Sequence, residues 1–348
     1  MAQNTSGQKL IVIVGPTASG KSDLGIKLAK KYNGEIISAD SRQVYKGMDI
    51  GTGKVTKKEQ KIVKHYLLDV VSPKRRFTAD DFKKLGEKAI DTILAKGKIP
   101  IITGGTGFYI DILLNRMQTA QVPPNIKLRA KLSRFALRFA QLANRGSSIS
   151  QRNSSGISKK SGRNLEAEAL FRLLKKIDPE RAKTIDHQNK RRLVRAIEIV
   201  VLTGKPVPNS RFNILNSRFN ILWLGLKPKN LEKRIKKRLE ERLKQGMIKE
   251  VKKLQDQGVS WQRLDDLGLE YRWISRWLIQ NEKIKMQNDN LKLESFKKTG
   301  YYEKLLREII KYSKRQMTWF KRNKNIAWIK NKKATDKLVA TFLKVPLH

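Results

Sequence analysis

The chain has 348 residues, 39% of them hydrophobic, so it can bury a sizeable core and should form roughly one to three domains. It has no cysteine, which excludes disulfide bonds and thiolate zinc sites, and it lacks the run of about 18 apolar residues that a membrane span needs. Its 76 Lys and Arg residues against 31 Asp and Glu residues give a net charge of +45, which favours a polyanionic partner such as a nucleic acid. An AT-rich genome would also raise the lysine content.

The first part of the chain alternates between strand-like and helix-like patterns. Short apolar runs predict strands at Leu10–Val14, Glu35–Ala39, Tyr66–Val71 and Ile99–Thr103, and helical spacing predicts helices at Ser22–Tyr32 and Asp80–Ala95. Such alternation predicts a parallel sheet with helices on both faces. The first apolar run is too short for the core of a signal peptide, so we expect a cytoplasmic protein.

From Ile126 onward the pattern is mainly helical. It predicts a strand at Ile221–Leu226 and helices at Glu166–Ile177, Lys190–Leu202, Leu231–Gln257 and Tyr301–Arg322. The stretch Gln141–Leu165 is rich in Ser and Gly and has no acidic residue, which predicts a mobile loop or linker. The heptapeptide NSRFNIL at 209–215 recurs at 216–222 and is interpreted as a local duplication that lengthens a connection.

A glycine-rich motif follows the first predicted strand directly. Its residues are Gly15, Pro16, Thr17, Ala18, Ser19, Gly20, Lys21 and Ser22, which fit the pattern G-x-x-x-x-G-K-[ST]. The glycines let backbone amides approach an anion, and the following helix points its free N–H groups and positive dipole end at that anion. Lys21 would add a charge between phosphates, and Ser22 could ligate Mg²⁺. The motif predicts binding of a diphosphate or triphosphate without naming the reaction.

Asp40 follows the second predicted strand, at the sheet edge where ligands of α/β proteins bind. A carboxylate there could orient Mg²⁺ or accept a proton from an attacking nucleophile. It could equally cap the turn that follows, and the spacing alone leaves both roles open.

Ordered motifs along the chain resemble the bacterial type of the tRNA dimethylallyltransferase (tRNA isopentenyltransferase) family. Beyond the phosphate loop they are Ser38–Tyr45, Lys46–Thr52, His65–Asp69, Phe77–Phe82, Gly104–Tyr109, Asp178-Pro179, Arg191–Arg195, Thr203-Gly204, Arg234 with Arg238, and Lys314–Phe320. A series of motifs in the family's order is far more specific than the phosphate loop alone.

The resemblance implies transfer of a dimethylallyl group from dimethylallyl diphosphate to the exocyclic amine of adenosine 37, next to the anticodon of tRNA. It implies that Asp40 takes the amine proton, and that Thr106, Arg238 and Lys21 hold and stabilise the leaving diphosphate, with Mg²⁺ as cofactor at Ser22. The positions that match tRNA contacts are Asp40, Ser41, Arg42, Gln43, Thr106, Arg129, Arg191, Arg192 and Arg195.

Physical chemistry agrees with these implied roles. An aromatic amine is a weak nucleophile, so positioning and a nearby carboxylate matter, and the leaving diphosphate gains charge that cationic side chains can meet. The target base must be extruded from the anticodon stem–loop to be reached. Arg234, Arg238 and Arg242 recur on one predicted helix face, where we expect Arg238 to act on the donor and Arg242 to lie at the surface.

We therefore expect an α/β fold with a P-loop NTPase-like parallel sheet core flanked by helices. Residues 1–118 and 196–348, which include the C-terminal basic helices, should form this core, and residues 119–195 should form an inserted smaller all-helical tRNA-binding domain. The expected partners are the tRNA anticodon stem–loop and dimethylallyl diphosphate, with no membrane contact, and the protein should be a monomer. The basic side of the last long helix (Lys304, Arg307, Lys311, Lys314, Arg315) is a candidate for RNA phosphates.

Three alternatives compete with this interpretation. A relative that prenylates free adenine nucleotides would not need a charge of +45. A P-loop kinase would need an ATP-reading lid and a second arginine set, and neither is identifiable in the sequence. A non-catalytic RNA-binding protein with an inactive phosphate loop is disfavoured because Lys21, Ser22 and Asp40 are intact.

Overall fold

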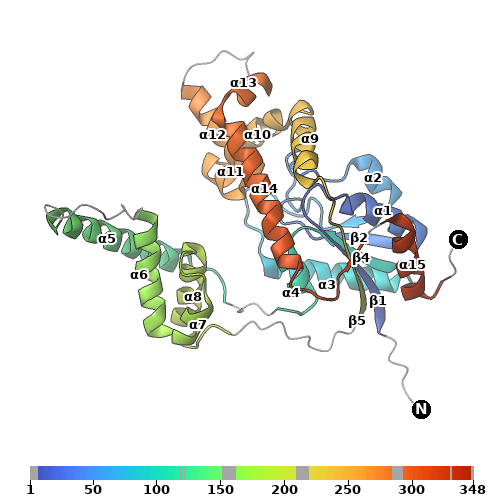
Figure 1. Ribbon diagram of the computed structural model, residues 1–348, viewed down its shortest axis with the longest axis horizontal. Helices are drawn as coiled ribbons and strands as arrows, with labels where there is room; N and C mark the ends of the chain where they lie inside the picture. Colours follow the sequence, from blue (N-terminus) through green and yellow to red (C-terminus); the bar gives the residue numbers. More distant parts are fainter. Residues whose placement is uncertain are drawn as a thin grey trace. The chain divides into compact units, whose positions relative to one another are not determined.

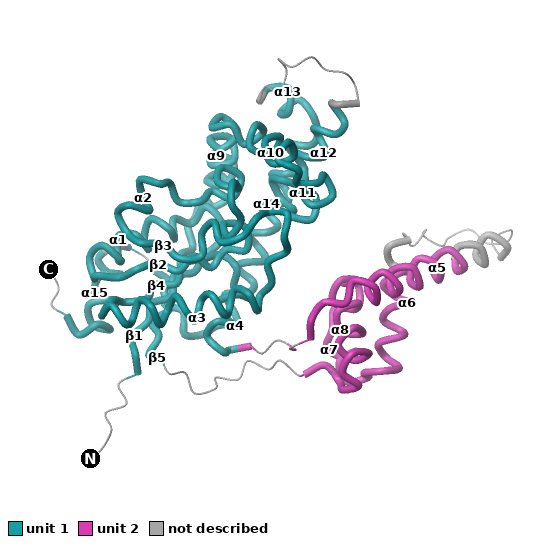
Figure 2. Tube along the Cα trace, turned by 180° about the vertical axis from the view of Figure 1, so that it is seen from behind, with its two compact units in different colours: residues 1–116, 214–348 teal, residues 117–213 magenta. Residues whose placement is uncertain are grey.

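The structure is a computed structural model that describes residues 7–117, 120, 122–150, 162–208, 219–283, 293–329 and 331–345. The chain divides into two compact units: unit 1 comprises Met1–Arg116 and Ile214–His348, and unit 2 comprises Met117–Asn213 (Figure 2). In the part of the chain that is described, no helix combines the length and the apolar character needed to cross a bilayer.

Unit 1 is built on one parallel sheet, as the alternating pattern predicted (Figure 1). Its described strands are β1 (Gln8–Val14), β2 (Gly34–Ser38), β3 (His65–Tyr66), β4 (Ile99–Gly104), β5 (Phe219–Gly225) and β6 (Ala327–Trp328), in the spatial order β3-β2-β4-β1-β5-β6. Ile101 of β4 pairs with Ile11 of β1 on one side and with Ile36 of β2 on the other. β4, which leads to Thr106, therefore lies between β1, which leads to the phosphate loop, and β2, which leads to Asp40.

Helices cover both faces of the sheet because the central strands are apolar on both sides. The helices of unit 1 are α1 (Lys21–Lys31), α2 (Lys57–Ile62), α3 (Ala79–Ala95), α4 (Gly107–Leu113), α9 (Leu231–Lys244), α10 (Met247–Asp256), α11 (Trp261–Leu267), α12 (Leu269–Lys283), α13 (Leu293–Lys298), α14 (Gly300–Phe320) and α15 (Lys332–Leu343). Val12 and Ile102 pack with residues of α3 and α4, whereas Ile11 and Ile13 pack with residues of α1 and α15.

The helices from α9 to α14 share a second core with the segment that follows β2. Tyr45 and Met48 of that segment are buried together with Leu239, Trp277 and Leu305. This packing ties the loop after Asp40 to the C-terminal helices.

Two sequence predictions for unit 1 are wrong in detail. The expected helix Leu231–Gln257 is two helices, α9 and α10. Gly246 between them adopts a φ of 98°, which breaks the helical conformation. The expected strand Tyr66–Val71 is only the two-residue β3. Leu67 and Asp69 have positive φ values, and an ion pair of 2.6 Å between Lys54 Nζ and Asp69 Oδ1 helps to hold this turn.

Unit 2 is all-helical within its described residues. Its helices are α5 (Ile126–Ser150), α6 (Gly162–Ile177), α7 (Pro179–Thr184) and α8 (Lys190–Thr203). Leu132, Leu170, Leu174, Leu193 and Ile197 form its core.

The limits of unit 2 differ from the expected 119–195. The unit extends to Asn213, and α8 runs without a break past residue 195 to Thr203 and packs on α6 through Leu193 and Ile197. The Ser-rich stretch was expected to be a loop from Gln141, yet α5 continues to Ser150; residues 151–161 lie outside the described part. The first NSRFNIL copy and the start of the second also lie outside it, and residues 219–222 of the second copy begin β5.

Candidate active site

Three loops of unit 1 leave the same edge of the sheet. β1 leads into the phosphate loop, β2 leads to Asp40, and β4 leads through Gly105 to Thr106. Because these strands are parallel neighbours, their carboxyl ends meet, which is where ligands of α/β sheets bind. The sequence-predicted residues of unit 1 are thus gathered in one place.

The phosphate loop has the backbone that an anion cradle requires. Gly20 precedes α1 with a φ of 90°, and the Ser19 amide donates to the Pro16 carbonyl at 3.2 Å, which closes the turn. A Cβ on Gly15 would lie 2.7 Å from Ser19 Oγ and 2.9 Å from the Leu226 carbonyl oxygen, so only glycine fits there. Ser19 Oγ is buried without a hydrogen-bond partner. An unpaired buried hydroxyl beside a helix N-terminus suits an anionic ligand.

Lys21 connects the cradle electrostatically to Asp40 and to Arg238 of α9. Its Nζ donates to the Pro16 carbonyl at 3.3 Å. Burial lowers the pKa of Lys21 to about 8; the negative charge of Asp40 opposes this shift and the positive charge of Arg238 adds to it. Lys21 is therefore within electrostatic range of both Asp40 and Arg238.

Asp40 is held by the turn that follows it. Its Oδ1 accepts hydrogen bonds from the backbone amides of Arg42 at 2.8 Å and Gln43 at 3.4 Å. Among the described residues no hydrogen bond reaches Oδ2. The capping role and the chemical role considered from the sequence are thus compatible, because one oxygen caps the turn and the other is available to a substrate.

Thr106 is fixed against the segment that carries Asp40. Its amide donates to the Ala39 carbonyl at 3.1 Å, and its Oγ1 accepts from the Ser41 amide at 3.1 Å. Tyr109, one turn further on, stacks on Phe82 with ring centroids 4.4 Å apart. The loops after β2 and β4 therefore form one hydrogen-bonded unit.

The three arginines of α9 have different environments. Arg234 Nε donates to the Ala18 carbonyl of the phosphate loop at 2.9 Å. Arg238 is exposed to solvent as a whole residue. Partial burial of its guanidinium and, to a smaller extent, the charge of Arg242 lower the pKa of that group. The expectation that Arg242 lies at the surface is wrong: its side chain is 13% exposed and pairs with buried Glu270 at 2.9 Å.

Arg242 belongs to an anchor for the loop that contains Gly51. Its Nη1 donates to the Gly51 carbonyl at 2.6 Å, and Glu250 accepts from the amides of Asp49, Ile50 and Gly51 at 2.6–3.0 Å. Tyr271 also donates to Glu250, at 2.8 Å. The anchored loop continues to Gly53, which lies beside Arg238: a Cβ on Gly53 would be 3.2 Å from Arg238 Nη2.

Two polar residues of α14 reach the site and were missed in the sequence. Gln316 contacts the phosphate loop and the Gly105 loop. Tyr312 lies near Thr106 and is influenced by the charge of Asp40. Both interrupt the apolar face that Leu305, Ile309 and Phe320 mark on this helix. A polar residue on an otherwise buried helix face is the signal that could have revealed them.

The arginines predicted to contact tRNA from unit 2 fall into two groups. Arg191 and Arg192 are exposed in the first turn of α8. Arg129 and Arg195 instead hold Glu198, which is completely buried, at 2.7 Å and 2.6 Å. Burial alone would raise the pKa of Glu198, but the hydrogen bonds from these arginines and from the Asn125 amide lower it. A tRNA contact by any of the four stays a prediction.

We expect Glu198→Ala to destabilise unit 2 by about 2–4 kcal/mol, because two guanidinium groups lose the carboxylate that neutralises them. Each arginine side chain keeps about a third of its surface exposed, which reduces the cost below that of a fully buried pair. Denaturant unfolding measures the loss. Glu168→Ala is the control: it breaks the exposed pair with Arg172 and should cost less than about 1 kcal/mol. Equal unfolding free energies for the two variants would contradict the assignment.

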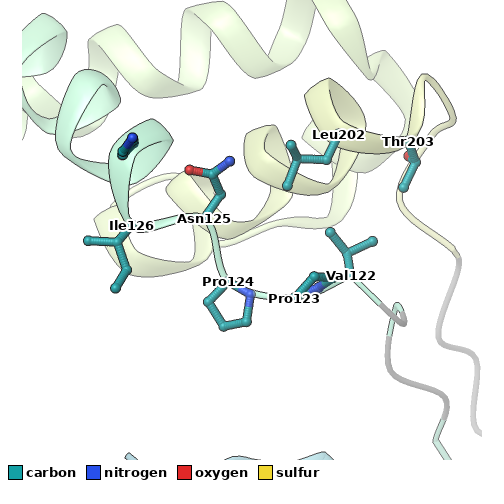
Figure 3. Close-up of a pocket in the computed structure, with 8 residues that line it drawn as sticks. Val122, Pro123, Pro124, Asn125, Ile126, Leu202 and Thr203 are labelled. Atoms are coloured by element: carbon teal, nitrogen blue, oxygen red, sulfur yellow. The ribbon is translucent and has the colours of Figure 1, made fainter.

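A pocket of about 620 Å³ lies in unit 2, where the segment before α5 passes the end of α8 (Figure 3). Val122, Pro123, Pro124, Ile126 and Leu202 line it, and Lys127 is its one charged lining residue. It therefore offers no cradle for a diphosphate, unlike the edge of the sheet in unit 1.

Comparison with known proteins agrees with this geometry. The family model described as IPP transferase matches residues 43–323. A tRNA dimethylallyltransferase of Acetivibrio thermocellus is 37% identical over 324 residues, which cover 92% of this chain and 91% of that protein.

Solved structures give the same result. The tRNA isopentenylpyrophosphate transferase of Bacillus halodurans superposes with a TM-score of 0.60 at 31% identity, covering 97% of this chain and 95% of that one. The corresponding enzyme of Staphylococcus epidermidis also gives a TM-score of 0.60, at 33% identity, covering 97% of this chain and 99% of that one. The chain therefore belongs to the IPP transferase family.

Proposed function

We propose that this chain transfers a dimethylallyl group from dimethylallyl diphosphate to the exocyclic amine of adenosine 37 in tRNA. The observation that carries the proposal is the meeting of a diphosphate cradle with a carboxylate. Lys21 and Asp40 come from loops on either side of Thr106, and they influence each other electrostatically. The proposal also rests on the family to which the chain belongs.

In this reaction the adenosine nitrogen forms a bond to the first prenyl carbon while the bond from that carbon to the diphosphate oxygen breaks. Asp40 Oδ2 accepts the proton that the amine loses. Negative charge grows on the departing diphosphate, and Lys21, Arg238 and the amides of the phosphate loop provide cations and donors where it develops. Thr106 would contact the leaving group from the loop between them.

The residues of the cradle fit a Mg²⁺ ion bound together with a diphosphate. Among the described residues no group of three His, Cys, Asp or Glu side chains could hold a metal by itself. Mg²⁺ commonly takes one or two protein ligands and completes its shell with phosphate oxygens and water, and Ser22 at the start of α1 can supply such a ligand. When bound, the ion would neutralise part of the diphosphate charge.

We propose that tRNA is the polyanion for which the net charge of +45 is suited. Exposed cations are available in both units. The candidates for contact with tRNA phosphates include Arg191 and Arg192 on α8, and Lys304, Arg307, Lys311, Lys314 and Arg315 on α14. Because tRNA is the acceptor, we place the enzyme in the cytoplasm, and we propose that it acts as a monomer.

An acceptor comparison tests this function against its alternatives. The protein is incubated with dimethylallyl diphosphate and either unmodified tRNA or AMP, and separately with labelled ATP. We expect prenylation of tRNA and none of AMP. Prenylation of AMP alone would identify an enzyme of free nucleotides, and phosphate transfer from ATP would identify a kinase.

The lowered pKa of Lys21 predicts how donor binding depends on pH. In the free protein Lys21 is charged below its pKa of about 8 and neutral above it. The dissociation constant of inorganic diphosphate should therefore rise by up to about tenfold per pH unit above 8, as a cation is lost from the cradle. Calorimetric titration in the presence of Mg²⁺ measures this dependence.

Lys21→Arg is the matched control, because arginine stays charged and any remaining pH dependence belongs to the ligand itself. Identical pH profiles for the wild type and this variant would contradict the role of Lys21.

A further inference from the structure

Gln316 of α14 bridges two loops of the reaction centre. Its Oε1 accepts from the Thr17 amide of the phosphate loop at 2.8 Å, and its Nε2 donates to the Gly105 carbonyl at 2.9 Å. The side chain is buried. Gln316 therefore ties the loop after β1 to the loop after β4.

The chemistry of the bridge requires an amide. An N–H group can be met only by an acceptor and a carbonyl only by a donor, and a glutamine side chain offers one of each. Glutamate would set a second carboxylate oxygen against the Gly105 carbonyl, and an apolar side chain would leave both loops without partners. Gly105 is also required, because a Cβ there would lie 2.2 Å from Gln316 Nε2.

A second contact from the same helix reaches the neighbouring residue. Tyr312 lies one turn before Gln316 and near Thr106, whose Oγ1 accepts from the Ser41 amide. The charge of Asp40 acts on Tyr312, so this contact lies at the centre of the site. One face of α14 therefore touches the phosphate loop, Gly105 and Thr106.

The geometry points to Gln316 as a positioning residue for the transfer reaction. It sets the spacing between the diphosphate cradle and the Thr106–Asp40 pair, so that the prenyl carbon and the attacking amine meet in a reactive geometry. This inference rests on the proposed function. It differs from a simple structural role, because other hydrogen bonds also hold these loops: Ser19 to Pro16 within the phosphate loop, and Thr106 to Ala39 and Ser41 between the other two loops.

The test uses Gln316→Met in the full-length chain. We expect the dissociation constants of inorganic diphosphate and of tRNA to stay within about threefold of the wild type, because the substitution removes neither the phosphate loop nor the exposed cations proposed to bind tRNA. The single-turnover rate at saturating donor and tRNA should fall about 10–100-fold, since a misplacement of about 1 Å has an effect of that size. Ser313→Ala is the control: Ser313 is buried on the same helix and donates only within it, to the Ile310 carbonyl, so its rate should not change.

Gly105→Ala provides a second variant that disturbs the bridge from the opposite side, and it decides the matter if Gln316→Met does not fold. A rate equal to that of Ser313→Ala would overturn the inference. So would a loss of diphosphate affinity in proportion to the rate, because Gln316 would then merely support the cradle. If the wild type itself fails to prenylate tRNA, the proposed function fails instead.

Discussion

Asp40→Ala should lower the rate of prenyl transfer to tRNA by about 10²–10⁴-fold, the usual contribution of a positioned general base. Diphosphate binding should survive, because the cradle of β1 and α1 contains no atom of Asp40. Single-turnover kinetics with saturating tRNA, combined with calorimetry for diphosphate, separates these two effects.

Asp40→Asn distinguishes the role of Asp40 as proton acceptor from its role as cap of the turn after β2. Asparagine keeps an oxygen that can accept from the Arg42 and Gln43 amides, so the turn after β2 is retained while the proton acceptor is lost. We expect this variant to be nearly as inactive as Asp40→Ala. A rate close to that of the wild type would mean that Asp40 acts only as a cap.

Arg238→Ala should lower the single-turnover rate by about 10²–10³-fold, as observed when one donor to a developing anion is removed. The affinity for tRNA should change little, because the expected partner of Arg238 is the diphosphate. Filter binding of tRNA and rapid-quench kinetics measure the two quantities.

Lys237→Ala is the control for charge, because Lys237 is an exposed cation on the same helix. It should reduce neither quantity by more than about twofold, apart from a slight loss of tRNA affinity at low salt. If both variants weaken tRNA binding equally and leave the rate unchanged, Arg238 belongs to the RNA surface and not to the reaction centre.

The positions of the phosphate loop and of Asp40 could be predicted from the sequence because their signals are local. The phosphate loop and Asp40 each directly follow an apolar strand, and the carboxyl ends of neighbouring parallel strands must meet. The roles of Thr106 and Arg238 came instead from the resemblance to a family. Nothing in the spacing of Arg234, Arg238 and Arg242 distinguishes a residue that faces the diphosphate from a residue that anchors a loop.

The errors have physical causes. An apolar residue at every fourth position made α9 and α10 look like one helix, since both face the same core, whereas the φ of Gly246 separates them. Arg242 looked exposed because its partner Glu270 is distant in sequence. The polar character of Gln316 on a buried helix face could mark it as a candidate, but its partner Thr17 lies 299 positions earlier, so the local pattern does not identify the contact. The helix over Lys190–Leu202 was expected, but the domain boundary was drawn inside it at residue 195; packing of α8 on α6 keeps the whole helix in unit 2.

The most direct measurement is mass spectrometry of nucleosides and of anticodon fragments from unmodified tRNA that has been incubated with the protein, Mg²⁺ and dimethylallyl diphosphate. We expect isopentenyladenosine at position 37 with the wild type, and its loss with Asp40→Asn. Unmodified adenosine at that position after incubation with folded, diphosphate-binding wild-type protein would contradict the account.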